Sequence, residues 1–153
     1  MTDAHPIRIL LVDDSESDRT LAALGLRRFK VANELVTAED AEAALVLLAD
    51  DTQPLPDLIL LDLNMPGMGG LEFLRVVKAN EQYRSIPVII MTSSTMEEDI
   101  AAAYNSYCSG YIRKPVNMAA FTKIVATIES YWFVIVRRPS RTGRRGAAAK
   151  GNP

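Results

Sequence analysis

The stretch Ile7-Arg8-Ile9-Leu10-Leu11-Val12-Asp13-Asp14-Ser15 joins a short, largely apolar run to a pair of acids. A run of this length with polar residues at its end is typical of a strand buried on both faces of a sheet. Leucines recur at near-helical spacing from Ser15 to about Phe29, and Ser15 or Ser17 can cap the start of a helix. The stretch therefore predicts a buried strand that leads through an acidic turn into a helix.

The same alternation continues along the chain. Further strands are predicted at residues 34–37, 58–61, 87–91 and 110–112, and further helices at residues 39–49, 70–80, 97–104 and 117–131. The helix at 70–80 is expected to turn Leu71, Leu74 and Val77 to the core and Lys78 to solvent. Five strands alternating with five helices predict an α/β fold, in which helices cover both faces of a five-stranded parallel sheet.

Composition and charge place limits on the organisation of the chain. Its 153 residues are about the size of one domain. The net charge of -2 averages two unlike parts, because residues 137–153 carry six basic and no acidic residues, which leaves residues 1–136 with a net charge of -8. An acidic body disfavours a nucleic-acid-binding core.

The remaining limits concern the cellular location. A single cysteine, Cys108, cannot form a disulfide within the chain, which fits a reducing compartment. The apolar run near the start is too short for a signal peptide, and no apolar run approaches the ~20 residues that span a bilayer. We therefore expect a cytoplasmic protein without a membrane partner.

Polar residues follow four of the predicted strands: Asp13 with Asp14, Asp62, Thr92 and Lys114. Taken alone, an aspartate after a strand is commonly a turn residue, Thr92 a strand-end residue and Lys114 a solvated surface lysine. The carboxyl ends of parallel strands meet at one edge, however, so these side chains are expected to converge. Three carboxylates repel one another unless a cation lies between them, and oxygen ligands with room for water favour Mg²⁺. Lys114 and Thr92 can hold phosphoryl oxygens, so the set predicts phosphoryl transfer to an aspartate.

Four stretches carry a family resemblance. Residues 11–15 (LVDDS), 60–70 (LLDLNMPGMGG), 91–94 (MTSS) and 110–115 (GYIRKP) resemble the receiver domain of two-component response regulators. The resemblance covers roughly residues 6–131, and it implies a flavodoxin-like, doubly wound sheet with strand order 2-1-3-4-5. It also implies that a phosphohistidine on a sensor histidine kinase is the phosphoryl donor.

The resemblance assigns roles to individual residues. It implies Asp62 as the phosphoacceptor, Asp14 and Asp62 as direct ligands of Mg²⁺, Asp13 as a ligand through water, Asn64 as a ligand through its backbone carbonyl, Lys114 as the partner of a phosphoryl oxygen, and Thr92 and Tyr111 as the switch pair. The peptide bond before Pro115 is expected to be cis. The alternative to a switch role for Tyr111 is that of a half-buried aromatic residue that packs in the strand.

The chain after the expected receiver domain, residues 1–131, divides into two segments. Residues 132–136 extend an apolar run that begins at Tyr131. This run either lengthens the last helix, folds back on the body, or pairs two copies in a homodimer. Its sequence resembles the end of single-domain regulators that serve bacterial phytochromes. Residues 137–153 are expected to form a disordered basic tail. This tail either only adds solubility or serves as an interaction arm.

We expect a stand-alone response regulator that switches a protein-binding surface when Asp62 is phosphorylated. The 17 residues after Val136 are too few for a DNA-binding domain. The protein is not expected to be an enzyme that acts on a separate substrate, beyond its own phosphorylation and dephosphorylation. One alternative is an aspartyl-phosphate-type phosphatase. Such an enzyme needs a further acid or base, but the one histidine, His5, lies near the start of the sequence and no other such group is obvious. Another is a regulator that binds DNA through its basic tail.

Overall fold

The computed structural model describes residues 7–27, 33–93 and 97–114. Five strands lie parallel in the order β2-β1-β3-β4-β5, which confirms the predicted sheet. They are β1 (Ile7–Val12), β2 (Asn33–Ala38), β3 (Leu58–Leu61), β4 (Val88–Thr92) and β5 (Gly110–Arg113). The observed bounds differ from the predicted ones by at most one residue at either end of each strand.

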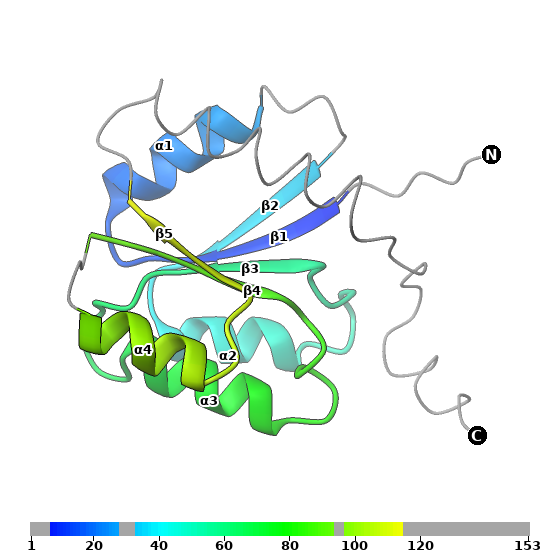
Figure 1. Cartoon of the computed structure of the whole chain (residues 1–153). Coiled ribbons are helices and arrows are strands. Elements are labelled where there is room, and N and C mark those ends of the chain that lie inside the picture. The colour runs from blue at the N-terminus through cyan, green and yellow to red at the C-terminus, as the bar shows by residue number, and fades with distance from the viewer. Residues whose placement is uncertain (1–6, 28–32, 94–96, 115–153) are drawn as a thin grey trace.

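Helices cover both faces of the sheet. They are α1 (Glu16–Leu26), α2 (Ala41–Ala49), α3 (Gly70–Ala79) and α4 (Glu97–Asn105). Figure 1 shows α1 on one face and α2, α3 and α4 on the other, as a doubly wound fold requires. The helix predicted at 117–131, the apolar extension, the basic tail and the bond before Pro115 lie outside the described residues.

The strands supply two cores from alternate residues. In β1, Leu10 and Val12 pack in the cluster that includes α2 and α3, whereas Ile9 and Leu11 pack in the cluster that includes α1. This alternation follows from the two-residue period of a strand, and it explains why the central strands are apolar at nearly every position. The central strands are therefore held on both sides, which fixes where their carboxyl ends lie.

Lys78 corrects one prediction. Its side chain is half-buried rather than solvated, and its Nζ donates hydrogen bonds to the backbone oxygens of Arg84 at 3.0 Å and Ile86 at 2.7 Å. Burial lowers the pKa of Lys78 from its ordinary value. The lysine thus ties the end of α3 to the loop that leads into β4.

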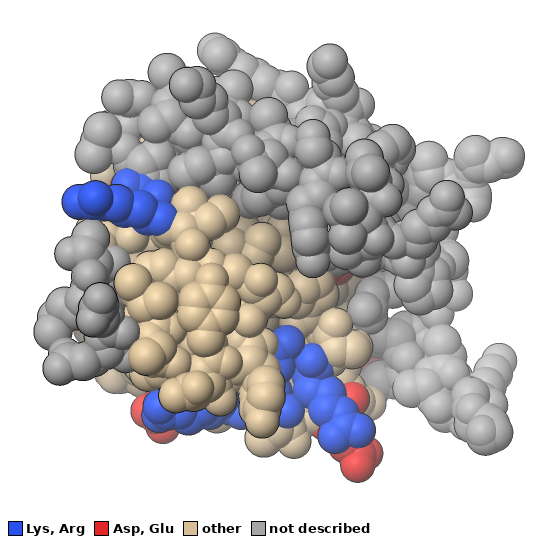
Figure 2. All heavy atoms as spheres, in the orientation of Figure 1, with Lys and Arg blue, Asp and Glu red and all other residues tan. Residues whose placement is uncertain are grey.

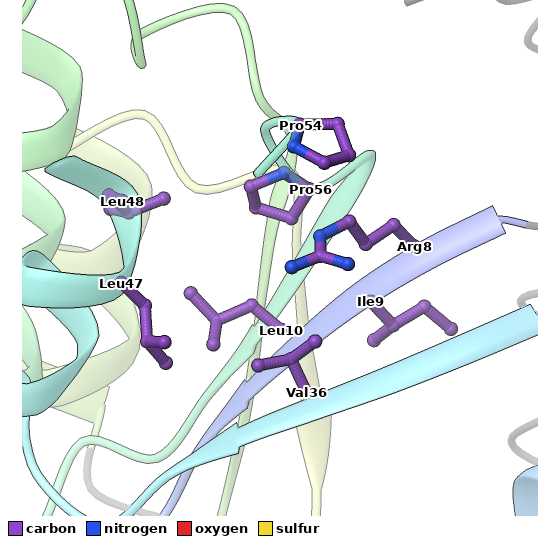
Figure 3. A pocket seen from close by; sticks show the side chains of 8 residues that line it. All are labelled: Arg8, Ile9, Leu10, Val36, Leu47, Leu48, Pro54 and Pro56. Atoms are coloured by element: carbon purple, nitrogen blue, oxygen red, sulfur yellow. The ribbon is translucent and has the colours of Figure 1, made fainter. Parts of the chain in front are cut away.

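A hollow lies between α2 and the amino-terminal part of the sheet (Figure 3). It is lined by Arg8, Ile9, Leu10, Val36, Leu47, Leu48, Pro54 and Pro56. Arg8 extends over it, and an Arg8 Nη1 to Glu34 Oε1 ion pair of 2.8 Å satisfies its charge. The Arg8 amide donates to Asp57 Oδ2 at 2.9 Å, which ties β1 to the loop before β3. These contacts order the sheet at the end opposite the predicted site.

Among the residues that the structure describes, no helix is long and apolar enough to cross a membrane.

Candidate functional site

The polar residues predicted at the strand ends are fixed by the sheet itself. The pairing of the strands continues past their ends, because the Asp62 amide donates to the Val12 oxygen at 3.0 Å and the Lys114 amide donates to the Thr92 oxygen at 2.8 Å. In the same way, the Asp13 amide donates to the Ala38 backbone oxygen at 3.0 Å. The backbone at these positions is therefore held by the same kind of hydrogen bonding as the core strands.

Three carboxylates meet at this edge. Asp13, Asp14 and Asp62 each offer a carboxylate oxygen, and these oxygens lie within 4.8 Å of one another. Asp13 and Asp62 are 1% and 5% exposed, whereas Asp14 is open to solvent. A set of oxygen donors with one side open suits a hard divalent cation that keeps part of its water. The donor set therefore fits divalent metal binding.

Lys114 inserts one ammonium group among carboxylates. Its Nζ lies 2.9 Å from Asp13 Oδ2, 3.3 Å from Asp62 Oδ2 and 2.6 Å from Asp18 Oδ2. Burial alone lowers the pKa of Lys114, but the hydrogen bonds to Asp18 and Asp13 and the negative charges around the ammonium raise the pKa above its ordinary value. Lys114 is therefore charged at neutral pH.

Asp13 shows the opposite balance. Burial raises the pKa of Asp13, and the hydrogen bond from the Ser15 amide and the contact with Lys114 offset only part of that rise. The nearby charge of Asp62 raises it further. Negative charge at this edge is thus costly in the absence of further cations, which again favours a bound cation.

Thr92 and Asn64 form a second set of contacts beside Asp62. Thr92 is buried, and its Oγ1 accepts a hydrogen bond of 3.2 Å from Asn64 Nδ2. The Asn64 amide donates to Asp62 Oδ1, also at 3.2 Å. The Asn64 side chain therefore connects the loop after Asp62 to the hydroxyl at the end of β4. The role predicted for its backbone carbonyl stays a prediction.

Tyr111 lies on β5 beside β4, where it pairs with Ile90. Its side chain is half-buried and packs against the core cluster of α2 and α3. This position is compatible with a switch residue and equally with a half-buried aromatic residue that only packs in the strand, so the switch role stays a prediction.

Sequence reasoning missed Asp18 and Arg19. Ser15 caps α1, since its Oγ accepts from the Asp18 amide at 3.2 Å, and the Ser15 amide donates to Asp13 Oδ1 at 2.9 Å. Arg19 Nη1 donates to the Asp13 backbone oxygen at 2.7 Å. Helical side chains tilt toward the amino terminus of the helix. Asp18 lies three residues after the cap Ser15, and Ser15 directly follows Asp14, so the Asp18 side chain can reach back to the site. That spacing was the available signal.

Comparison with known proteins agrees with this geometry. The sequence profile of the response regulator receiver domain matches residues 9–126. Response regulator Rcp1 of Synechocystis is 37% identical over 139 residues, which cover 88% of this chain and 95% of Rcp1.

Two solved structures share the fold over most of this chain. The Mn²⁺-bound form of Rcp1 has a TM-score of 0.79 at 37% identity and covers 88% of this chain and 100% of its own. The phosphorylated cyanobacterial phytochrome response regulator RcpA has a TM-score of 0.82 at 34% identity and covers 89% of this chain and 100% of its own. The chain belongs to the receiver domain family of two-component response regulators, whose members take phosphoryl groups from sensor histidine kinases, and it is homologous to phytochrome response regulators.

Proposed function

We propose that this chain is a phosphorylation-controlled binding switch in which Asp62 is the phosphoacceptor. The observation that carries the proposal is the position of Asp62. Its carboxylate is buried, lies beside Asp13 and Asp14, and has Lys114 Nζ 3.3 Å from its Oδ2. A nucleophilic carboxylate with a cation on one side and a metal-binding set on the other suits phosphoryl transfer.

The reaction follows from these contacts. An Asp62 carboxylate oxygen forms a bond to phosphorus while the bond from phosphorus to the histidine nitrogen of the kinase breaks. Lys114 donates to a phosphoryl oxygen and balances its charge. Asp14 and Asp62 would hold Mg²⁺ directly, Asp13 would hold it through water and Asn64 through its backbone carbonyl, and the ion would supply further positive charge. Asp13 also keeps the ammonium of Lys114 in place, at 2.9 Å.

The phosphoryl group then acts on the neighbouring hydroxyl. It adds strong acceptor oxygens beside Asp62, and these compete with the present contacts of Thr92, including the bond from Asn64 Nδ2. Thr92 turns to donate to a phosphoryl oxygen, and Tyr111 moves into the space that this frees. The local change of charge thereby alters the surface around β5.

The surface over α4 suits a protein partner. Figure 2 shows that the described part of this face is mostly uncharged, with lysine, arginine and a few acidic side chains at its margins. Two tyrosines at the end of α4, Tyr104 and Tyr107, are 50% and 76% exposed. Exposed aromatic side chains are enriched at protein interfaces. The switched surface is therefore the output, and the protein needs no reaction on a separate substrate.

The similarity to Rcp1 and RcpA supports a phytochrome-type sensor histidine kinase as the phosphoryl donor. Such a partner places the protein in the cytoplasm. We further propose a homodimer that pairs through residues 132–136. An aspartyl-phosphate-type phosphatase and a DNA-binding regulator fit the comparisons less well.

The test is labelling by a small phosphodonor such as phosphoramidate in the presence of Mg²⁺. The native protein is expected to gain one hydroxylamine-labile phosphoryl group, and Asp62→Asn is expected to abolish the labelling. Glu81→Gln, which changes an exposed acid outside the site, serves as the control and is expected to be labelled normally. Persistent labelling of Asp62→Asn moves the acceptor to another residue.

The kinase is tested separately. Phosphotransfer from a purified bacterial phytochrome kinase is expected to be faster than phosphotransfer from an unrelated sensor kinase under the same conditions. Equal rates contradict the phytochrome assignment and leave the role of Asp62 intact.

A further inference from the structure

Asp18 makes the shortest of the three ion pairs around Lys114. The distances from Lys114 Nζ are 2.6 Å to Asp18, 2.9 Å to Asp13 and 3.3 Å to Asp62, so the longest pair is the one with the proposed phosphoacceptor. The two partners in the Asp18 pair are 31% and 14% exposed at their side chains. Because both are partly shielded from water, this contact is stronger than a pair on the open surface.

The position of Asp18 is built into the start of α1. Its amide donates to Ser15 Oγ at 3.2 Å, and the Ser15 amide in turn donates to Asp13 Oδ1 at 2.9 Å. Arg19 Nη1 holds the Asp13 backbone oxygen at 2.7 Å. These bonds join the first turn of α1 to the acidic end of β1. The backbone of Asp18 is therefore held by a local framework that places its carboxylate within reach of Lys114.

An ammonium group has three N–H donors, and three carboxylates surround this one. Phosphorylation adds acceptor oxygens and negative charge at Asp62, and Lys114 has to turn a donor toward them. Asp18 opposes that step in two ways: it draws the ammonium toward α1, and its own charge repels the added charge.

We propose that Asp18 is a positioning residue that competes with the phosphoryl group for Lys114 and thereby slows phosphorylation of Asp62. The inference rests on the proposed function, because it requires Asp62 to be the acceptor. Its consequence is that the first turn of α1 sets how readily the site accepts a phosphoryl group.

The test compares three variants of the full chain at saturating Mg²⁺. Asp18→Asn removes the charge and keeps the size of the side chain. Glu16→Gln is the matched control, because it removes one charge from an exposed acid in the same turn of α1. Asp18→Glu keeps a carboxylate within reach of Lys114. The measurements are the rate of labelling by phosphoramidate and, by calorimetry, the affinity for beryllium trifluoride, an analogue of the phosphoryl group.

We expect Asp18→Asn to raise both the labelling rate and the affinity about three- to tenfold, as loss of one charge-assisted hydrogen bond allows. Glu16→Gln is expected to stay within about twofold of the native protein, since an exposed charge is screened by solvent. Asp18→Glu is expected to return both values toward native. Circular dichroism checks folding, and Asp18→Ser replaces the asparagine variant if that variant is unstable.

The outcomes separate this inference from the proposed function. Equal values for Asp18→Asn and native protein overturn the competition, as does a fall in either value. An equal rise in Glu16→Gln attributes the effect to general charge and also overturns it. If the native protein is not labelled at all, or if Asp62→Asn is labelled, the proposed function itself fails.

Discussion

Lys114 sets its one positive charge against the carboxylates of Asp13, Asp18 and Asp62. Removal of one partner from a buried ion pair is more destabilising than the pair is stabilising, because it leaves the other charges uncompensated in a poorly solvated place. Lys114 thus contributes to stability as well as to the proposed chemistry.

We predict that Lys114→Met lowers the free energy of unfolding by about 2 kcal/mol in the absence of divalent cations. Saturating Mg²⁺ is expected to reduce this deficit, because a cation among Asp13, Asp14 and Asp62 neutralises the same carboxylates. Urea unfolding with and without Mg²⁺ measures both values. Arg113→Met, which removes an exposed positive charge next in the chain, is the control and is expected to change stability little.

The pH dependence of this stabilisation has a definite sign. The pKa of Lys114 is raised in the folded state above its ordinary value of 10.5. Its stabilisation is therefore fully present below pH 10.5 and is lost as the pH rises through the folded pKa. We expect the stability difference between native protein and Lys114→Met, measured by urea unfolding without Mg²⁺, to be constant from pH 7 to 9. A steady decline over this interval would contradict the raised pKa.

The predictable part of the site is the part that the sheet alone places. Asp13, Asp62 and Thr92 lie at the ends of apolar runs, and parallel strands bring such ends together. Asp18 and Lys78 lie on helices, where polar residues face solvent by default. Their contacts depend on the rotation of each helix and on its neighbouring loop, which hydrophobic periodicity does not specify.

At the scale of elements, the start of α3 packs unusually closely against the loop that carries Asp62. A Cβ atom at Gly70 would lie 2.4 Å from the Asp62 backbone oxygen and 2.6 Å from Leu63 Cα. The Gly70 amide donates to the Leu63 oxygen at 3.0 Å, so the approach is part of the hydrogen bonding of this turn. The glycine is required for contact between backbones.

We predict that Gly70→Ala lowers the free energy of unfolding by about 2 to 4 kcal/mol, because backbone atoms cannot yield as a flexible side chain can. Labelling of Asp62 is expected to slow as the loop shifts. Gly69→Ala is the matched control: its Cβ meets nothing nearer than 3.9 Å and its φ is not positive, so a change below about 1 kcal/mol is expected. Thermal and urea unfolding measure the stabilities, and equal losses in the two variants would count against close packing at Gly70.

The end of α4 carries a strained residue. Tyr107 has a φ of 70°, and the Cys108 amide closes the turn on the Ala103 oxygen at 3.2 Å. Glycine is preferred where a chain leaves a helix in this left-handed conformation, because a side chain there costs roughly 1 kcal/mol. We predict that Tyr107→Gly raises the free energy of unfolding by about 1 kcal/mol, as measured by urea unfolding. Tyr107→Ala keeps the strain and is expected to give no such gain.

At the scale of the whole molecule, the alternation of apolar runs and amphipathic segments was enough to predict the parallel sheet and the two-sided covering of helices. The strand order came from the family motifs, and pairing of β1 with both β2 and β3 confirms it. Which surface a partner contacts is less accessible from the sequence, because exposed residues on separate elements form a surface only after folding. The tyrosines at the end of α4 show this.

The proposed homodimer rests on six consecutive apolar residues, 131–136, followed by the basic segment 137–153. Exposed apolar area costs roughly 25 cal/mol per Å², and two-fold pairing of the same segment in two copies removes that area from water. We predict that truncation after Ser130 converts a dimer to a monomer in sedimentation velocity. Truncation after Val136 is the matched control, since it removes only the basic segment and is expected to leave the dimer intact. A monomeric full chain refutes the pairing. If removal of residues 137–153 alone abolishes the dimer, the contact depends on the charge of that segment, and the dimer of the full chain should then weaken as salt is added.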